Sequence, residues 1–395
     1  MSLESFISDI NSLAFWKEFT FAQNKFSPAP EAELELADNI VWLEDFALII
    51  QLKERTEPSG EPETERRWFR DKIEKKAKNQ IRDTLTYLAE HKDISITNER
   101  GHVFQIRGQE LTEIVRVIVY FGDDALPDDC REVQFLDSAS AGFVHVLEAN
   151  EYLEVLKVLR VPGDIREYFR YRQDALTQLG DSGDWLTEAD ILGGYTHDEA
   201  LPRVGARVYL EALIQDFDSF SLTGLIGNIH KNIESVHSAT DHYRIMLEFA
   251  KVPRSVWRGI KGLLQYAMER VKAEIFGSPV RAFYPKSDCV FMILPLDPQL
   301  WGGGETEKQR RAKGLQYFTY IAKYIHGAKR AIGIQISRDG TDYLIDWALH
   351  DEPWQPDPEL EGRLAKFNPF QPRIEWRTAS YSGKVDVCTS SSEDL

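Results

Sequence analysis

The sequence predicts an α/β protein, and three stretches of its N-terminal half lead to this prediction. Residues 39–53 hold two apolar runs that alternate like the strands of a hairpin. Residues 61–91 carry apolar side chains at helical spacing, and residues 113–121 form a β-rich run that ends at turn-forming residues. A hairpin, a helix and a further strand in this order predict a mixed sheet with helices packed on its faces.

The predicted hairpin turns at Glu44 and Asp45. The register set by this turn places Asp38 opposite Gln51, and directly opposed side chains share one face of a sheet. Lys53 lies two residues beyond Gln51 and therefore on the same face. We expect a carboxylate, a carboxamide and an ammonium group to converge at one end of the hairpin.

This set of side chains suits metal-assisted hydrolysis of a phosphodiester. Mg²⁺ prefers oxygen ligands and keeps several waters, so one carboxylate and one amide oxygen, here from Asp38 and Gln51, can hold it. Lys53 would then position or polarise the attacking water. The alternative is a surface hairpin whose polar ends are solvated, since such short patterns also occur by chance.

The hairpin resembles the PD-(D/E)xK nuclease superfamily, especially Mrr-type restriction endonucleases and nuclease-related (NERD) domains. Glu35 and Asp38 match an acidic residue placed shortly before an Asp-led strand, and Gln51 and Lys53 match the Gln variant of the following (D/E/Q)xK motif. The resemblance implies that Asp38 and Gln51 are metal ligands and that Lys53 is the catalytic lysine. Glu35, or alternatively Glu33, would be the upstream acidic residue.

The resemblance extends to about His91 and implies a restriction-endonuclease-like fold, with Mg²⁺ or Mn²⁺ as cofactor and DNA as substrate. It also implies prokaryotic defence against foreign DNA as the biological setting. One condition must hold for the match. Glu35 and Asp38 are three residues apart, so a regular strand would place them on opposite faces, and a helix end or a β-bulge is required between them.

The segment 61–91 is predicted to be one helix with an apolar stripe for packing on the sheet. From Glu65 to Asp83, both included, eight basic residues stand against four acidic ones, and this local excess could meet a phosphate backbone. The resemblance adds Gln80 as a residue that contacts the lysine or the substrate. The predicted substrate-binding residues are therefore Arg70, Lys75, Lys76, Lys78 and Gln80. The alternative is a solvated helix face with intrahelical ion pairs.

The first domain is predicted to end near residue 180. Two strands and one helix follow the strand at 113–121, at residues 133–135, 143–147 and 152–159. Asp164 has the position of an N-cap for a further helix. The glycine-containing residues 180–184 are predicted to be a linker, so the nuclease-like domain spans residues 1–180.

Residues 185–395 are predicted to form a second α/β or α+β domain. Its helical segments are 207–217, 241–249 and 256–275, and its strands are 288–296, 331–337 and 343–349. The last two strands are joined by Asp339 and Gly340, which is a typical hairpin turn. We expect this domain to serve binding, dimerisation or sensing, with a second copy of the chain or a partner defence protein as its partner.

Three features of the second domain have simpler explanations than function. The glycine-rich residues 301–305 lack the Lys and Ser or Thr of a P-loop and are predicted to be a loop. His230, His237 and His242 lack the spacing of zinc ligands. The basic helix at 305–326 could bind nucleic acid or a partner, but its aromatic residues are more simply explained as core.

Composition indicates a soluble protein of the reducing cytoplasm. The chain has 395 residues, a net charge of −17 and three cysteines far apart in the sequence, which form neither a metal-binding pair nor a disulfide framework. We expect no secretion signal, no transmembrane segment and no membrane partner. Because the global charge is acidic, a nuclease of this composition must hold DNA with local basic patches.

Two functions remain after this reasoning. The first is a metal-dependent DNA endonuclease. The second is a catalytically inactive protein that keeps the nuclease fold and acts as a nucleic-acid-binding or scaffold component of a defence complex. Gln51 in place of an acidic residue and the acidic composition favour the second.

Overall fold

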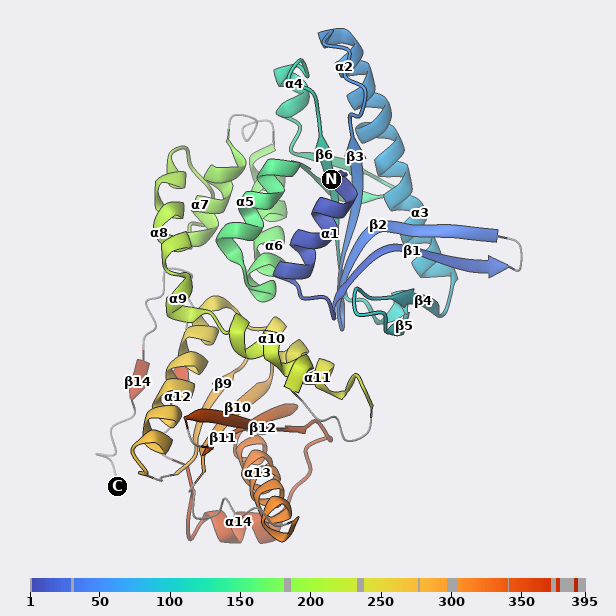
Figure 1. Cartoon of the computed structure of the whole chain (residues 1–395). Coiled ribbons are helices and arrows are strands. Elements are labelled where there is room, and N and C mark those ends of the chain that lie inside the picture. Colours follow the sequence, from blue (N-terminus) through green and yellow to red (C-terminus); the bar gives the residue numbers. More distant parts are fainter. Residues whose placement is uncertain are drawn as a thin grey trace. The chain divides into compact units, whose positions relative to one another are not determined.

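The computed structural model describes residues 2–29, 32–180, 186–232, 238–275, 278–296, 305–339, 341–370, 374–376 and 387–389 (Figure 1). The chain divides into two compact units, Met1–Gln215 and Asp216–Leu395, and each unit contains its own β-sheet. Both units combine a sheet with helices, so the predicted α/β class is confirmed.

The first unit is built on one mixed sheet flanked by helices. Its elements are α1 (Leu3–Ala14), β1 (Thr20–Ala29), β2 (Ala32–Leu43), β3 (Phe46–Glu54), α2 (Pro62–Phe69), the π-helix η1 (Arg70–Ala77), α3 (Lys78–Glu90), β4 (Ile94–Thr97), β5 (Val103–Ile106), the 3-10 helix η2 (Gly108–Glu110), β6 (Glu113–Phe121), α4 (Asp128–Arg131), β7 (Phe135–Ser138), β8 (Gly142–Glu148), α5 (Ala149–Leu159), α6 (Pro162–Leu179), α7 (Glu188–Thr196), the 3-10 helix η4 (Ala206–Tyr209) and α8 (Leu210–Gln215). The described strands of the main sheet lie in the order β1-β2-β3-β6-β8-β7. The sequence predictions missed α1, β1, β4, β5, α4 and α7.

The hairpin of β2 and β3 has the predicted register. Leu43 pairs with Phe46, and the antiparallel ladder continues to the pair Asn39 and Ile50. Glu44 adopts a φ of 56°, the left-handed conformation that two-residue hairpin turns favour. On its other edge β3 runs parallel to β6. Helices α1 and α5 lie on one side of these strands and the helix made of α2, η1 and α3 on the other (Figure 1), which is why β3 is buried on both faces.

The predicted helix over residues 61–91 is confirmed, with one unexpected feature. Its middle, Arg70–Ala77, is a π-helix. The buried side chains Phe69, Ile73, Ala77 and Ile81 recur every four residues, and in an ideal α-helix this spacing drifts by roughly 40° per step. Looser winding counteracts the drift, so all four remain against the sheet.

Strand β2 contains a β-bulge next to the candidate site. Its partner β1 pairs Asn24 with Ala37 but Lys25 with Glu35, so Leu36 is an extra residue in β2. The Thr84 hydroxyl of α3 donates a hydrogen bond to the Leu36 carbonyl. The irregularity that the match of Glu35 and Asp38 requires is therefore present.

The boundary between the units differs from the predicted one near residue 180. The division falls after Gln215, because α7 packs on α6 through a fully buried ion pair between Arg172 and Glu188, with two oxygen–nitrogen distances of 2.9 Å. The predicted linker lies largely outside the described residues. Helix α6 also begins earlier than predicted: Val161 is the N-cap and Pro162 opens the helix, while Asp164 is buried in the first turn.

Glu151 on α5 makes the stability of the first unit depend on pH. Burial and the negative charge of Glu188 raise the pKa of the Glu151 carboxyl from 4.5 to about 7. An acid with a raised pKa in the folded state stabilises the fold fully below pH 4.5, and this contribution is lost as the pH rises to about 7. We expect Glu151→Gln to be more stable than the wild type above pH 7 by on the order of 1–3 kcal/mol.

The measurement is urea unfolding of both proteins across this pH range. Gln keeps the oxygen that accepts from the Glu148 amide, so the helix cap is preserved. The control is Glu154→Gln on the same helix, whose carboxylate is exposed. Equal pH dependence in the wild type and Glu151→Gln would contradict the assignment.

The second unit has a sheet of the order β12-β11-β10-β9-β13-β14 among its described strands. Its elements are α9 (Phe217–Phe220), α10 (Thr223–Asn232), α11 (Asp241–Ala250), α12 (Arg254–Lys272), β9 (Val280–Tyr284), β10 (Cys289–Pro295), α13 (Glu305–His326), β11 (Arg330–Asp339), β12 (Asp342–His350), α14 (Pro358–Leu364), β13 (Ile374–Trp376) and β14 (Val387–Thr389). Strands β10 and β11 are parallel and joined through α13, and β11 and β12 form the predicted hairpin. The predicted helix at 207–217 is instead split into η4, α8 and α9.

Within the described residues, no helix is long and apolar enough to cross a membrane. Cys130 and Cys289 are buried free thiols.

Candidate active site

The three side chains of the predicted motif lie at one end of the β2–β3 hairpin. Asp38 and Lys53 approach each other, with 3.6 Å between Asp38 Oδ2 and Lys53 Nζ. Gln51 is 2% exposed and Lys53 is largely buried. The ladder between the strands stops at Asn39 and Ile50, one pair short of Asp38 and Gln51.

The Asp38 carboxylate replaces the missing end of this ladder. Its Oδ2 accepts a hydrogen bond from the Leu52 amide at 2.5 Å, an amide that a continued ladder would have paired with β2. Asp38 therefore has a structural role as well as the charge that a metal site requires.

Gln51 contributes a buried oxygen without a partner. Its Oε1 is shielded from solvent and accepts no hydrogen bond from the described residues. A buried carbonyl oxygen in this state has lost water without replacing it, which destabilises the fold unless something else binds there. A cation or a substrate hydrogen-bond donor would supply the missing contact.

The bulge brings Glu35 to the same site. The exposed Glu35 carboxyl has a raised pKa, because it is partly desolvated and lies near the negative charges of Asp38 and Glu4, while Lys53 opposes the shift. Asp38 and Lys53 are thus both near enough to affect the pKa of Glu35. Glu33 has no described side chain.

Lys53 has a lowered pKa. Burial of its ammonium group is the main cause, the charge of Lys76 adds to it, and Asp38 and Glu35 oppose it. Lys53 Nζ also donates to the Leu52 carbonyl at 2.7 Å. Helix η1, which carries Lys76, packs against strands β3 and β6.

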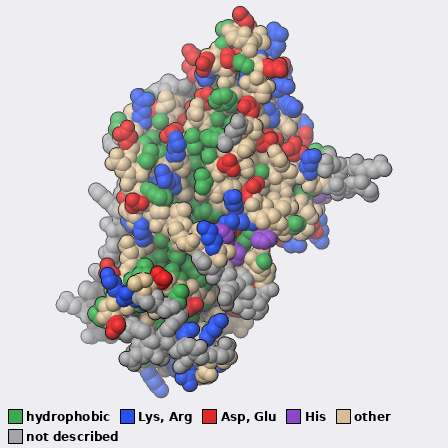
Figure 2. Space-filling view, in the orientation of Figure 1, with side chains coloured by type: hydrophobic (Ala, Val, Ile, Leu, Met, Phe, Trp, Pro, Cys, Tyr) green, Lys and Arg blue, Asp and Glu red, His purple; other side chains and the backbone are tan. Residues whose placement is uncertain are grey.

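The predicted substrate-binding residues of the long helix have different surroundings. Lys76 is exposed, and its charge contributes to the lowered pKa of Lys53. Gln80 has a buried Oε1 without a partner among the described residues. Lys75 is exposed and pairs with Asp71 at 2.9 Å, which is the surface ion pair of the alternative explanation. Arg70 is exposed and Lys78 is half-buried. Figure 2 shows Lys and Arg side chains along the edge formed by this helix, interspersed with acidic ones.

Two contributors were missed by sequence reasoning. Thr84 holds the bulge through the Leu36 carbonyl, and Glu4 of α1 adds negative charge near Glu35. A serine N-cap before α1 was a usable signal, because the Ser2 hydroxyl accepts from the Ser5 amide. The contact of Thr84 had no signal, since threonine in a helix usually bonds within the helix.

Among the described residues, no three His, Cys, Asp or Glu side chains are grouped so that they could hold a metal ion. His237 and residues 301–304 of the glycine-rich stretch lie outside the described part of the chain. His230 and His242 are on different helices, α10 and α11.

Comparison with known proteins gives no family: no protein-family model, no curated protein and no solved structure matches the chain.

Proposed function

We propose that the first unit is a metal-dependent endonuclease that hydrolyses phosphodiester bonds of DNA, with a restriction-endonuclease-like fold. The observation that carries the proposal is the grouping, on adjacent strands, of Asp38 and Lys53, 3.6 Å apart, with Gln51, whose buried oxygen has no partner within the described part of the chain. The bulge that brings Glu35 to these residues supports it, since the match to the motif depended on it.

The residues present fit a divalent cation with few protein ligands. Asp38 offers a carboxylate, and Gln51 offers an oxygen that has no hydrogen-bond partner among the described residues. Mg²⁺ typically takes one or two protein carboxylates and keeps several waters, so the lack of a three-acid cluster among the described residues agrees with this choice. A bound cation would supply Lewis-acid activation and neutralise charge on the phosphate.

Lys53 and Glu35 would act on the substrate from either side of Asp38. The Lys53 ammonium can donate to a phosphate oxygen or orient the attacking water, because the rigid strand β3 fixes its position. Glu35 is exposed, and partial desolvation together with the charge of Asp38 raises its pKa. It is placed to accept a proton or to bind a second water at the site.

The long helix would hold the DNA backbone through Lys76, with Gln80 contacting Lys53 or the substrate. Defence against foreign DNA in a prokaryotic cytoplasm is the setting that the motif suggests. The first test is incubation of the purified chain with end-labelled DNA and RNA duplexes of one sequence, with Mn²⁺, Mg²⁺ or EDTA. We expect metal-dependent shortening of DNA. Shortening of RNA alone would change the substrate class, and no shortening of either would reject the proposal.

Metal affinity should respond to the charge at position 51. We expect Gln51→Glu to bind Mn²⁺ at least several-fold more tightly than the wild type, because a carboxylate is a better ligand for hard cations than an amide. Gln51→Ala should bind more weakly. Calorimetric titration measures both affinities, and Gln105→Glu on β5 is the control for the added charge. Equal Mn²⁺ affinities of the wild type, Gln51→Glu and Gln51→Ala would show that Gln51 is not a metal ligand.

Charge reversal on the helix should weaken DNA binding in a salt-dependent way. We expect Lys76→Glu to lower affinity and to reduce the slope of log affinity against log salt by about 1 for each lost phosphate contact. The control is Lys92→Glu, an exposed lysine beyond the end of α3. Fluorescence anisotropy with labelled DNA in EDTA measures binding without cleavage. If both variants lose DNA affinity equally, the loss comes from the change in net charge of the chain. The helix is then a solvated surface without a specific DNA contact.

The second candidate function is a nucleic-acid-binding or scaffold protein without catalysis. The contacts of Asp38 favour it, because its carboxylate already accepts from the Leu52 amide and neighbours Lys53. In that case DNA binding would persist while Mn²⁺ neither binds near Asp38 nor supports cleavage.

A further inference from the structure

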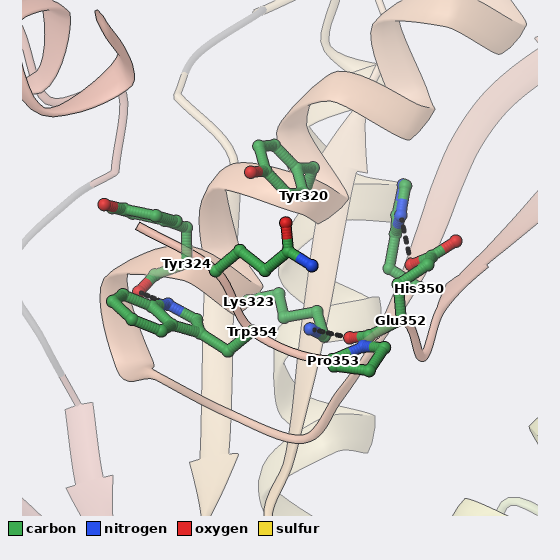
Figure 3. A pocket seen from close by; sticks show the side chains of 8 residues that line it. Tyr320, Lys323, Tyr324, His350, Glu352, Pro353 and Trp354 are labelled. Atoms are coloured by element: carbon green, nitrogen blue, oxygen red, sulfur yellow. Dashed lines mark hydrogen bonds and ion pairs between the residues drawn. The ribbon is translucent and has the colours of Figure 1, made fainter. Parts of the chain in front are cut away.

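The second unit contains a hollow of about 330 Å³, a volume at the lower end of the range for ligand pockets. It lies between helix α13 and the segment that follows strand β12. Its lining residues are Tyr320, Lys323, Tyr324, His350, Glu352, Pro353, Trp354 and Gln355. Figure 3 shows the aromatic side chains of Tyr324 and Trp354 side by side at one end and His350 at the other.

Lys323 in the wall of this hollow is a buried cation that forms no ion pair with the residues that the structure describes. The side chain is 3% exposed, and its Nζ donates to the backbone carbonyl of Glu352 at 2.6 Å. No carboxylate of the described residues lies within ion-pair distance of it. Burial lowers the pKa of Lys323, although the more distant charges of Glu352 and Asp288 oppose this. Buried charges are normally paired, because desolvation is costly, so an anion in the hollow would stabilise this lysine.

His350 adds an imidazole ring to the same wall. Its Nδ1 lies 3.3 Å from Glu352 Oε2, and its Nε2 lies 3.0 Å from the Gln316 carbonyl oxygen. Both neighbouring atoms are oxygens that can accept a hydrogen bond from the ring. The Glu352 carboxylate itself is largely exposed. The positive charge of the inner wall therefore comes from the buried Lys323 ammonium group.

The opposite end of the hollow is an aromatic surface. The rings of Tyr324 and Trp354 are stacked, with 5.3 Å between centroids and an interplanar angle of 26°. Hydrogen bonds hold this surface in place, from Trp354 Nε1 to the Tyr324 carbonyl and from the Tyr324 hydroxyl to Glu361. Trp354 remains 43% exposed, so a planar group can stack on it.

We propose that this hollow binds a nucleoside monophosphate group, with its phosphate at Lys323 and His350 and its base on Trp354. A wall with a buried lysine and an imidazole, together with an aromatic surface at the other end, matches this combination, and the volume suits one nucleotide rather than a longer strand. The group can come from a free nucleotide or from the phosphorylated end of a nucleic-acid strand. The site is separate from the nuclease site and does not depend on its activity.

The test is calorimetric titration of the full chain in EDTA, with AMP, adenosine, inorganic phosphate and a short single-stranded DNA with or without a 5′-phosphate. We expect AMP to bind more tightly than adenosine or phosphate. Lys323→Met should lower AMP affinity by roughly tenfold to a hundredfold, as for loss of a charged hydrogen bond, and leave adenosine binding unchanged. Trp354→Leu should weaken both.

The matched control is Lys329→Met, which removes the same charge from an exposed position just after α13 and should leave affinity unchanged. Thermal unfolding checks the variants, and Lys323→Met should fold because it removes only the buried charge and keeps the apolar stem. Preference for the 5′-phosphorylated DNA over AMP would identify the strand end as the source. No binding of AMP or phosphorylated DNA in the millimolar range, or equal affinity in Lys323→Met and Lys329→Met, would overturn the proposal.

Discussion

Replacement of Lys53 by Met should reduce metal-dependent DNA cleavage by roughly 10²- to 10³-fold, the loss typical when one preorganised donor is removed from an active site. The ammonium group is the part of Lys53 that would act on the phosphate or the attacking water. Met keeps the buried stem and removes a charge that burial already disfavours, so stability should change little. Initial rates on labelled DNA measure the effect.

Asp38→Asn is the companion variant. Alanine at this position would leave the Leu52 amide without its acceptor, and a loss of activity could then reflect local unfolding. Asparagine keeps an oxygen for that hydrogen bond and removes the charge. We expect a comparable loss of cleavage together with weaker Mn²⁺ binding. Lys92→Met is the control, and a thermal unfolding curve for each variant separates activity from stability. Near-normal rates in both site variants would exclude the assignment.

Glu188→Ala should be among the most destabilising single substitutions in the first unit. Its carboxylate accepts from Arg172 and from the Tyr168 hydroxyl, and both partners are completely buried. Removing it leaves an unpaired buried guanidinium, which costs about 3–5 kcal/mol. Chemical unfolding of the variant measures this loss directly.

The double variant Arg172→Met with Glu188→Leu removes both charges. It should be more stable than Glu188→Ala, since no buried charge remains unpaired. Asp71→Ala, which breaks the exposed pair with Lys75, is the control and should change stability by less than about 1 kcal/mol. A small effect of Glu188→Ala would mean that α7 does not depend on this pair, and that residues 186–215 join the first unit for another reason.

Much of the fold around the site was predictable because it follows local rules. The turn at Glu44 fixed the register of β2 and β3, and the register in turn placed Asp38 and Lys53 together. The predicted strand at 113–121 has the bounds of β6. β-Branched residues favour strands, and the turn residues on either side mark where this strand begins and ends. The spacing of four from Phe69 to Ile81 even contained a sign of the π-helix.

The features that escaped prediction depend on contacts distant in the sequence. Leu36 becomes a bulge residue only against β1 and Thr84, and neither contact leaves a local pattern. The unit boundary was placed too early because glycines at 180–184 resemble a linker, whereas the buried pair of Arg172 and Glu188 ties α7 back to α6. The hollow around Lys323 joins α13 to a segment beyond β12, so its residues are adjacent only after folding.

The most direct test of the nuclease assignment is conversion of supercoiled plasmid by the full chain, with Mn²⁺ or with EDTA. The expected result is nicked or linear plasmid with wild-type protein and Mn²⁺ only, and none with folded Lys53→Met or Asp38→Asn. Plasmid left intact by the wild type, or cut equally by the wild type and both variants, would contradict an active site built on Asp38, Gln51 and Lys53.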